Sequence, residues 1–115
     1  MNIEKIQRKL QTFSEDRGWD KFHTPQSLSI ALSVEVSELL EIFQWSKSRG
    51  VEEVSDIQKK AKIEDEVADI YIYLLILSQK LKLDIEQVLN KKIEKNRGKY
   101  PIENMCGHLK GNEKI

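Results

Sequence analysis

Two stretches of the sequence decide its fold: LSIALSVEVSELLEIFQW at residues 28–45 and IEDEVADIYIYLLIL at residues 63–77. Their apolar residues recur every three or four positions, which is the spacing along one face of an α-helix. The apolar residues also spread beyond a single face, so each helix is expected to contact more than one neighbour. The two stretches therefore predict a pair of long helices, over residues 26–46 and 57–82, at the centre of the fold.

Shorter helical patterns lie on either side of this pair. Apolar residues at helical spacing predict a helix over 3–15, and Asp84 starts a capping-box pattern that predicts another over 85–97. Thr24 followed by Pro25 is a typical start for the second helix, with a hydroxyl cap and a proline in the first turn. No strand-like alternation is long enough to compete. The sequence therefore predicts an all-α fold of the four-helix bundle type.

Length and charge balance limit the class of protein. The 115 residues fit one domain with a thin core, which we expect to cover residues 1–101 and to leave a flexible tail over 102–115. The 19 basic and 19 acidic residues give zero net charge, so no long-range field favours DNA, RNA or a membrane surface. The apolar run over 70–77 is too short to span a bilayer. A single cysteine, Cys106, fits a reducing compartment, and we expect a cytoplasmic protein.

Four carboxylates stand at or near the faces that the two central helices should bury. Glu35 and Glu38 form one pair at i, i+3 spacing, and Glu66 and Asp69 form another, so each pair lies on one side of its helix. Burying ionised carboxylates without partners is unfavourable, and four of them would repel one another. Magnesium would neutralise them, because it prefers oxygen ligands and bridges carboxylates to phosphates. A buried network of acids with a lysine such as Lys92 is the competing interpretation, and the pattern alone leaves both open.

A polar line runs along the last predicted helix. Lys92 falls inside the apolar arc of that helix, and Asn96 and Lys99 follow it at i+4 and i+7. Two cations and an amide are suited to binding a polyphosphate. A lysine that extends from an apolar surface into water would give the same pattern.

Aromatic residues gather in the loop GWDKFHTP and at the end of the second helix. Trp19, Phe22, His23 and Trp45 could line a slot for a planar base, since bases stack on aromatic faces. For any one of them, core packing is the more common explanation. His23 is better suited to hydrogen bonding with a base or phosphate than to binding a metal.

The stretches GWDKFHTPQSLSIALSVEVSELLEIFQW, EDEVADIYIYLL and KKIEKNRGKYP resemble the all-α nucleoside triphosphate pyrophosphatases, the MazG-like group. The resemblance covers about residues 3–101, and within the group it points to dCTP pyrophosphatases and related short bacterial enzymes. The hallmark of the group is ExxE, a spacer and ExxD. Here it reads Glu35 with Glu38, followed by Glu66 with Asp69.

The resemblance implies a magnesium-dependent enzyme that converts a nucleoside triphosphate, dCTP or a modified analogue, into the monophosphate and pyrophosphate. The four acids would bind magnesium, and we choose Glu38 as the base that activates water. Lys92, Asn96 and Lys99 match the K-x-x-x-N-x-x-[KR]-Y-P segment of the group and would contact phosphates or sugar.

The resemblance also assigns the aromatic residues and the assembly. Tyr73 would pack on the deoxyribose, and Trp19, His23 and Trp45 match base-side and phosphate-side positions. Members of the group form intertwined dimers or dimers of dimers, so a homodimer or homotetramer is expected. Two alternatives remain: a non-catalytic helical module that binds a nucleotide or a protein, and an enzyme for phosphoribosyl-ATP or dUTP. The aromatic loop makes the second alternative less favoured.

Overall fold

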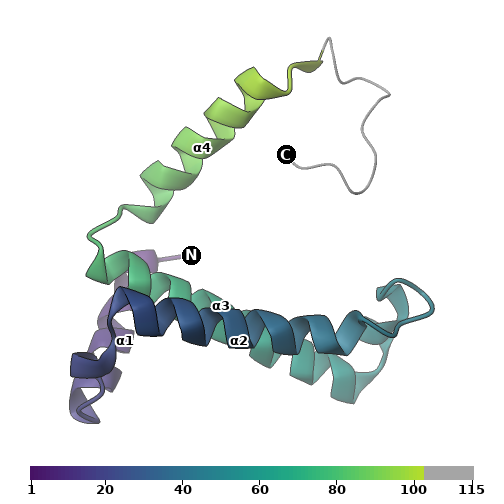
Figure 1. Cartoon of the computed structure of the whole chain (residues 1–115), viewed down its shortest axis with the longest axis horizontal. Coiled ribbons are helices and arrows are strands. Elements are labelled where there is room, and N and C mark those ends of the chain that lie inside the picture. Colours follow the sequence, from purple (N-terminus) through teal and green to yellow (C-terminus); the bar gives the residue numbers. More distant parts are fainter. Residues whose placement is uncertain (103–115) are drawn as a thin grey trace. The chain divides into compact units, whose positions relative to one another are not determined.

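The computed structural model describes residues 1–102, and all regular structure in this range is helical (Figure 1). The elements in chain order are α1 (Ile3–Asp16), the short 3₁₀ helix η1 (Asp20–Phe22), α2 (Pro25–Phe43), the 3₁₀ helix η2 (Val51–Ser55), α3 (Ile57–Lys80) and α4 (Ile85–Lys99). The predicted all-α fold is confirmed, and each predicted helix end falls within one turn of the observed end. The two 3₁₀ helices lie in segments predicted as loops. Residues 103–115, most of the predicted tail, lie outside the described range.

The chain divides into two units, Met1–Lys82 and the part from Leu83 onward, and each is described by itself. The first unit holds α1 to α3 with both 3₁₀ helices, and the second holds α4. The division falls in the turn between α3 and α4, where Lys82 has a φ of 56°. The boundaries predicted for a single domain stay a prediction. None of the described helices has the length and apolarity that crossing a membrane requires.

A side-chain cap begins each of the four α-helices of the described residues. The Thr24 hydroxyl accepts a hydrogen bond from the Ser27 amide at 3.1 Å, and the Ser27 hydroxyl accepts one from the Thr24 amide at 3.0 Å. Pro25 occupies the first turn of α2, as predicted. The side-chain carboxylates of Asp56 and Asp84 accept hydrogen bonds from first-turn amides and so cap α3 and α4. These caps satisfy amides that have no partner within their own helix.

Helices α2 and α3 pack side by side as an antiparallel hairpin (Figure 1). The turn that joins them is closed by local contacts. Gly50 has a φ of 90°, and a side chain there would place its Cβ 2.6 Å from the Phe43 ring. Glu53 is buried and forms an ion pair with Lys59 at 2.7 Å. Glycine is therefore required at position 50, because the backbone there is left-handed and because the Phe43 ring leaves no room for a side chain.

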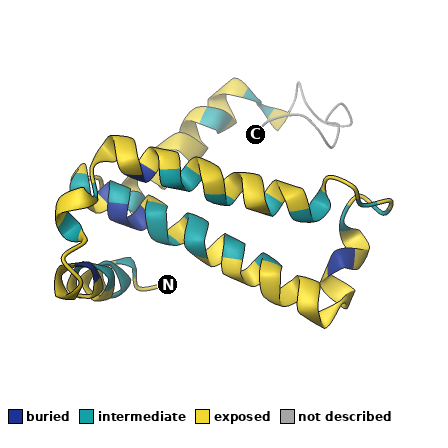
Figure 2. Cartoon of the chain, turned by 60° about the horizontal axis from the view of Figure 1, so that its bottom comes forward, coloured by how far each residue is buried: buried dark blue, intermediate teal, exposed yellow. Residues whose placement is uncertain are grey.

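The core of the first unit is small. Leu28 of α2 and Leu75 and Ile76 of α3 are the buried apolar residues of the described range. Figure 2 shows buried parts of the two long helices near the end of the hairpin where α1 packs against α3. The Gln7 side chain of α1 donates a hydrogen bond to the Leu75 carbonyl at 3.0 Å. Large apolar side chains of α2, including Ile30 at 59% and Leu40 at 60%, remain exposed.

We predict that this exposed face of α2 is covered by a second copy of the chain, because apolar faces of this kind mark association surfaces. Analytical ultracentrifugation should give a mass of two or four times 13.4 kDa. Val34→Glu should weaken association, since it places a charge in the interface. Gln26→Glu, at an exposed polar position of the same helix, is the matched control. A monomeric wild-type protein at micromolar concentration would contradict the prediction.

Candidate functional site

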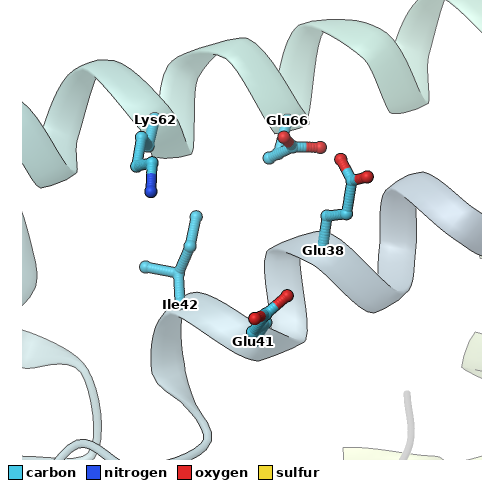
Figure 3. A pocket seen from close by; sticks show the side chains of 5 residues that line it. All are labelled: Glu38, Glu41, Ile42, Lys62 and Glu66. Atoms are coloured by element: carbon cyan, nitrogen blue, oxygen red, sulfur yellow. The ribbon is translucent and has the colours of Figure 1, made fainter.

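Three carboxylates meet between α2 and α3. One oxygen each of Glu35, Glu38 and Glu66 lies within 4.8 Å of the others. Glu35 and Glu38 are one turn apart on α2 and share a side of the helix, while Glu66 comes from α3. Figure 3 shows Glu38 and Glu66 pointing toward one another across the space between the helices. These three residues are called the acid cluster below.

The acid cluster has no cationic partner within the described residues. Glu35 Oε2 and Glu66 Oε2 are buried and accept no hydrogen bond there. No ion pair of the described chain involves any of the three acids. The pKa of Glu66 is raised from 4.5 to about 7, first because its proton can be shared with Glu35, then because of burial and of its contact with Glu38. Since unpartnered buried carboxylates are unfavourable, the cluster is suited to binding a cation.

Asp69, the fourth predicted acid, lies outside the acid cluster. It is one turn beyond Glu66 on α3, and its side chain is one methylene shorter than that of a glutamate. It lines an adjacent pocket of about 330 Å³ instead. The pKa of Tyr73 is raised by burial and then by the negative charges of Glu35 and Asp69. Tyr73 also lines this pocket, and the charge of Glu35 in the acid cluster acts on its hydroxyl. The assignment of Asp69 as a metal ligand stays a prediction.

This second site, called the aromatic pocket below, lies between α1, the loop after it and α3. Its lining residues are Leu10, Phe13, Ser14, Trp19, His23, Asp69, Ile72, Tyr73 and Ile76. Trp19 packs edge-on against Phe13 with ring centroids 5.7 Å apart. The Nδ1 atom of His23 is buried and has no hydrogen-bond partner in the described chain. Aromatic walls with an unpartnered ring nitrogen are suited to a planar ligand that has a polar edge.

The other predicted site residues are not placed at either site. Trp45 follows α2, is 84% exposed and lines neither the aromatic pocket nor the pocket at the acid cluster. Lys92, Asn96 and Lys99 all lie on α4, in the second unit. Their roles, and that of Trp45, stay predictions.

The structure adds residues that the sequence did not suggest. A pocket of about 400 Å³ at the acid cluster is lined by Glu38, Glu41, Ile42, Lys62 and Glu66 (Figure 3). Lys62 is the cation among them and lies one turn before Glu66 on α3. The i, i+4 spacing of Lys62 and Glu66 could have indicated this proximity from the sequence. It is weak evidence, because a lysine four residues from a glutamate is common on helices.

Known proteins are similar to this chain in both sequence and fold. Residues 30–110 match the model of the MazG-like family. The chain belongs to the MazG-like family. The resemblance predicted from the sequence is therefore confirmed, and the match extends beyond residue 101 into the predicted tail.

Among the relatives of this MazG-like chain are proteins known as pyrophosphatases. It is 35% identical to dCTP pyrophosphatase 1 of Mus musculus over 87% of this chain and 59% of the relative. The identity to dCTP pyrophosphatase 1 of Homo sapiens is also 35%, over 86% and 59%. The chain thus spans about three fifths of the length of these curated relatives. A pyrophosphatase from Archaeoglobus fulgidus is similar in structure, with a TM-score of 0.80 and 40% identity over 88% of this chain and 94% of that one.

The raised pKa of Glu66 predicts how pH affects the metal-free MazG-like chain. Its pKa in the folded state, about 7, exceeds the ordinary value of 4.5, so folding favours the protonated acid. This contribution to stability is fully present below about pH 4.5 and is lost as the pH rises through about 7. Calorimetry at a series of pH values, with a chelator present, tests this. The difference in melting temperature, wild type minus Glu66→Gln, should decrease as the pH rises from 5 to 8.

Glu64→Gln, an exposed neighbour on the same helix, should keep the wild-type dependence on pH. A wild type whose melting temperature rises relative to Glu66→Gln over this range would contradict the prediction.

Proposed function

We propose that this chain is a magnesium-dependent nucleoside triphosphate pyrophosphohydrolase. Its proposed substrate is dCTP or a modified analogue, and its products are the monophosphate and pyrophosphate. One observation carries the proposal: Asp69, which lines the aromatic pocket, stands one helical turn from Glu66 of the acid cluster on α3, and both sites belong to the first unit. A triphosphate needs a charged end and a nucleoside needs an aromatic end, and the two sites supply these side by side. The similarity to dCTP pyrophosphatases and to an archaeal pyrophosphatase supports this reaction.

The acid cluster fits a hard divalent cation. Every donor atom that it offers is a carboxylate oxygen, and the buried oxygens of Glu35 and Glu66 have no other partner in the described residues. Glu35, Glu38 and Glu66 would hold magnesium, with Asp69 as the candidate fourth ligand. Bound magnesium would neutralise phosphate charge and make a coordinated water more acidic.

Glu38 is the proposed general base. It is the exposed member of the acid cluster, so a proton that it accepts from water can pass on to solvent. The water oxygen would form a bond to the α-phosphorus as the bond to the bridging oxygen breaks, and pyrophosphate would leave. Glu35 and Glu66, which are less accessible, are better placed to bind than to exchange protons with solvent.

The aromatic pocket is the proposed site of the nucleoside. Its volume of about 330 Å³ lies within the range of ligand pockets, about 300–1,000 Å³, and is sufficient for a nucleobase. Trp19 would stack on the base, the free Nδ1 of His23 would bond its polar edge, and Tyr73 would pack on the sugar. Trp45 is proposed at the base from the family pattern alone.

The remaining proposals rest on the family pattern. Lys92, Asn96 and Lys99 of α4 would contact phosphates or sugar, as the matching segment of the family implies. We place the enzyme in the cytoplasm, with which its single cysteine is compatible. A homodimer or homotetramer would complete the thin core of each chain.

A pyrophosphate-release assay over canonical and modified triphosphates tests the reaction. Release should require magnesium and be greatest with a cytosine nucleotide. Glu38→Gln should lower kcat by about a hundredfold or more, the typical contribution of a general base, while circular dichroism stays unchanged. Asp69→Asn should also reduce activity. Glu64→Gln, on the exposed side of α3, is the control and should remain active.

An absence of pyrophosphate release with every triphosphate would refute the proposal. Metal-dependent binding without release, measured by calorimetry, would instead support a non-catalytic binding module.

Lys62 should contact the outer phosphates, because it is the cation that lines the pocket at the acid cluster (Figure 3). Lys62→Met should raise KM for the preferred triphosphate by about tenfold, which corresponds to about 1.4 kcal/mol. Inhibition by added pyrophosphate should weaken in parallel. Lys60→Met, at an exposed position on the same helix, is the control. An unchanged KM and unchanged inhibition in Lys62→Met would exclude this role.

A further inference from the structure

We infer that the ion pair between Asp20 and Lys80 fixes the distance between the two walls of the aromatic pocket, so that Asp20 and Lys80 are positioning residues for Trp19 and His23. The inference rests on the proposed function only for the nature of the ligand. The geometry belongs to residues of the first unit alone.

The contacts converge on one oxygen. Asp20 Oδ1 accepts a hydrogen bond from Lys80 Nζ at 2.5 Å and another from Gln11 Nε2 at 3.0 Å. Asp20 is the first residue of η1, Lys80 is the last of α3, and Gln11 lies on α1. A single carboxylate therefore joins three elements. None of these three residues lines the aromatic pocket, so they act on it through their neighbours.

Both walls of the aromatic pocket are next to this ion pair. Trp19 directly precedes Asp20, and His23 follows it by three residues. On the other wall, Ile76 stands one helical turn before Lys80 on α3. The ion pair consequently spans from the loop wall to the helix wall.

The loop wall has few other attachments. A three-residue 3₁₀ helix is too short to hold its own place, so contacts with other elements decide where it lies. The Trp19 amide donates to the Ser14 carbonyl of α1 at 2.9 Å, and the Ser27 hydroxyl of α2 donates to the Phe22 carbonyl at 2.6 Å. Among the hydrogen bonds of residues 1–102, only that of Lys80 joins η1 to α3.

The solvent exposure of this ion pair favours a positioning role over a role in global stability. The Lys80 side chain is 26% exposed and that of Asp20 is 36% exposed. Ion pairs with this much access to water contribute little to folding. Breaking the pair should therefore leave the fold intact and release the loop that carries Trp19 and His23.

Tryptophan fluorescence tests the inference without any assay of activity. The chain has two tryptophans, so Trp45→Phe leaves Trp19 as the sole reporter. In that background, Lys80→Met and Asp20→Asn should shift the Trp19 emission to longer wavelength and increase its quenching by acrylamide. Lys80→Arg should keep the wild-type spectrum, and the charge-exchanged pair Asp20→Lys with Lys80→Asp should restore it. Lys82→Met, at the adjacent exposed lysine, is the matched control.

Kinetics of the same ion-pair variants with Trp45 intact supply the second readout. Lys80→Met should raise KM several-fold and reduce the preference among bases, while kcat and the melting temperature change little. Unchanged emission and quenching in both single variants would overturn the inference, as would a shift that Lys80→Arg and the charge-exchanged pair both fail to correct. If the wild type hydrolyses no triphosphate, the proposed function fails, and the fluorescence still decides whether the ion pair positions the loop.

Discussion

Three carboxylates face one another across the α2–α3 interface, and the rest of the first unit has to hold the two helices together despite their repulsion. The buried apolar residues Leu28, Leu75 and Ile76 lie toward one end of the hairpin. The turn with Gly50 and the buried Glu53 closes the other end. The acids thus lie between two stabilised ends, where helix packing fixes their separation before any cation binds. Such preorganisation is what a metal centre requires, because less free energy is then spent on ordering the ligands.

The two ends of the candidate site differ in their chemistry because their surroundings differ. The pocket at the acid cluster is lined by three carboxylates, one lysine and one isoleucine, and the aromatic pocket mainly by rings and branched apolar residues. Asp69 and Tyr73 line the aromatic pocket, and the pKa of Tyr73 is raised by burial and then by the negative charges of Glu35 and Asp69. A ligand with a charged chain and a flat, apolar head would be recognised by both parts together, and neither part alone would distinguish it from simpler anions or rings.

Much of the fold could be predicted from the sequence because it depends on local rules. Helical periodicity identified the helices, and the residue types at Thr24, Pro25 and Asp84 identified their starts. The i, i+3 pairs placed acids on two helices, but only the packing shows that Glu35, Glu38 and Glu66 meet while Asp69 borders another pocket. The bond between Asp20 and Lys80 joins residues 60 positions apart, and no local pattern specifies it. Periodicity places Lys92, Asn96 and Lys99 on one helix, but it does not determine what they contact, and their roles stay predictions.

The turn between α2 and α3 has a consequence for how this chain can vary in evolution. The contacts of Gly50 with Phe43 and of Glu53 with Lys59, and the hydrogen bonds within the turn, lie between residues 43 and 59 and involve no residue of the acid cluster. The register of the carboxylates is therefore set by the packed helices and not by the segment that connects them. Insertions and deletions in a connecting segment add little closure entropy, so its length can drift among descendants while the acids stay opposite one another. A spacer of variable length between two fixed acidic pairs is what such a hairpin permits.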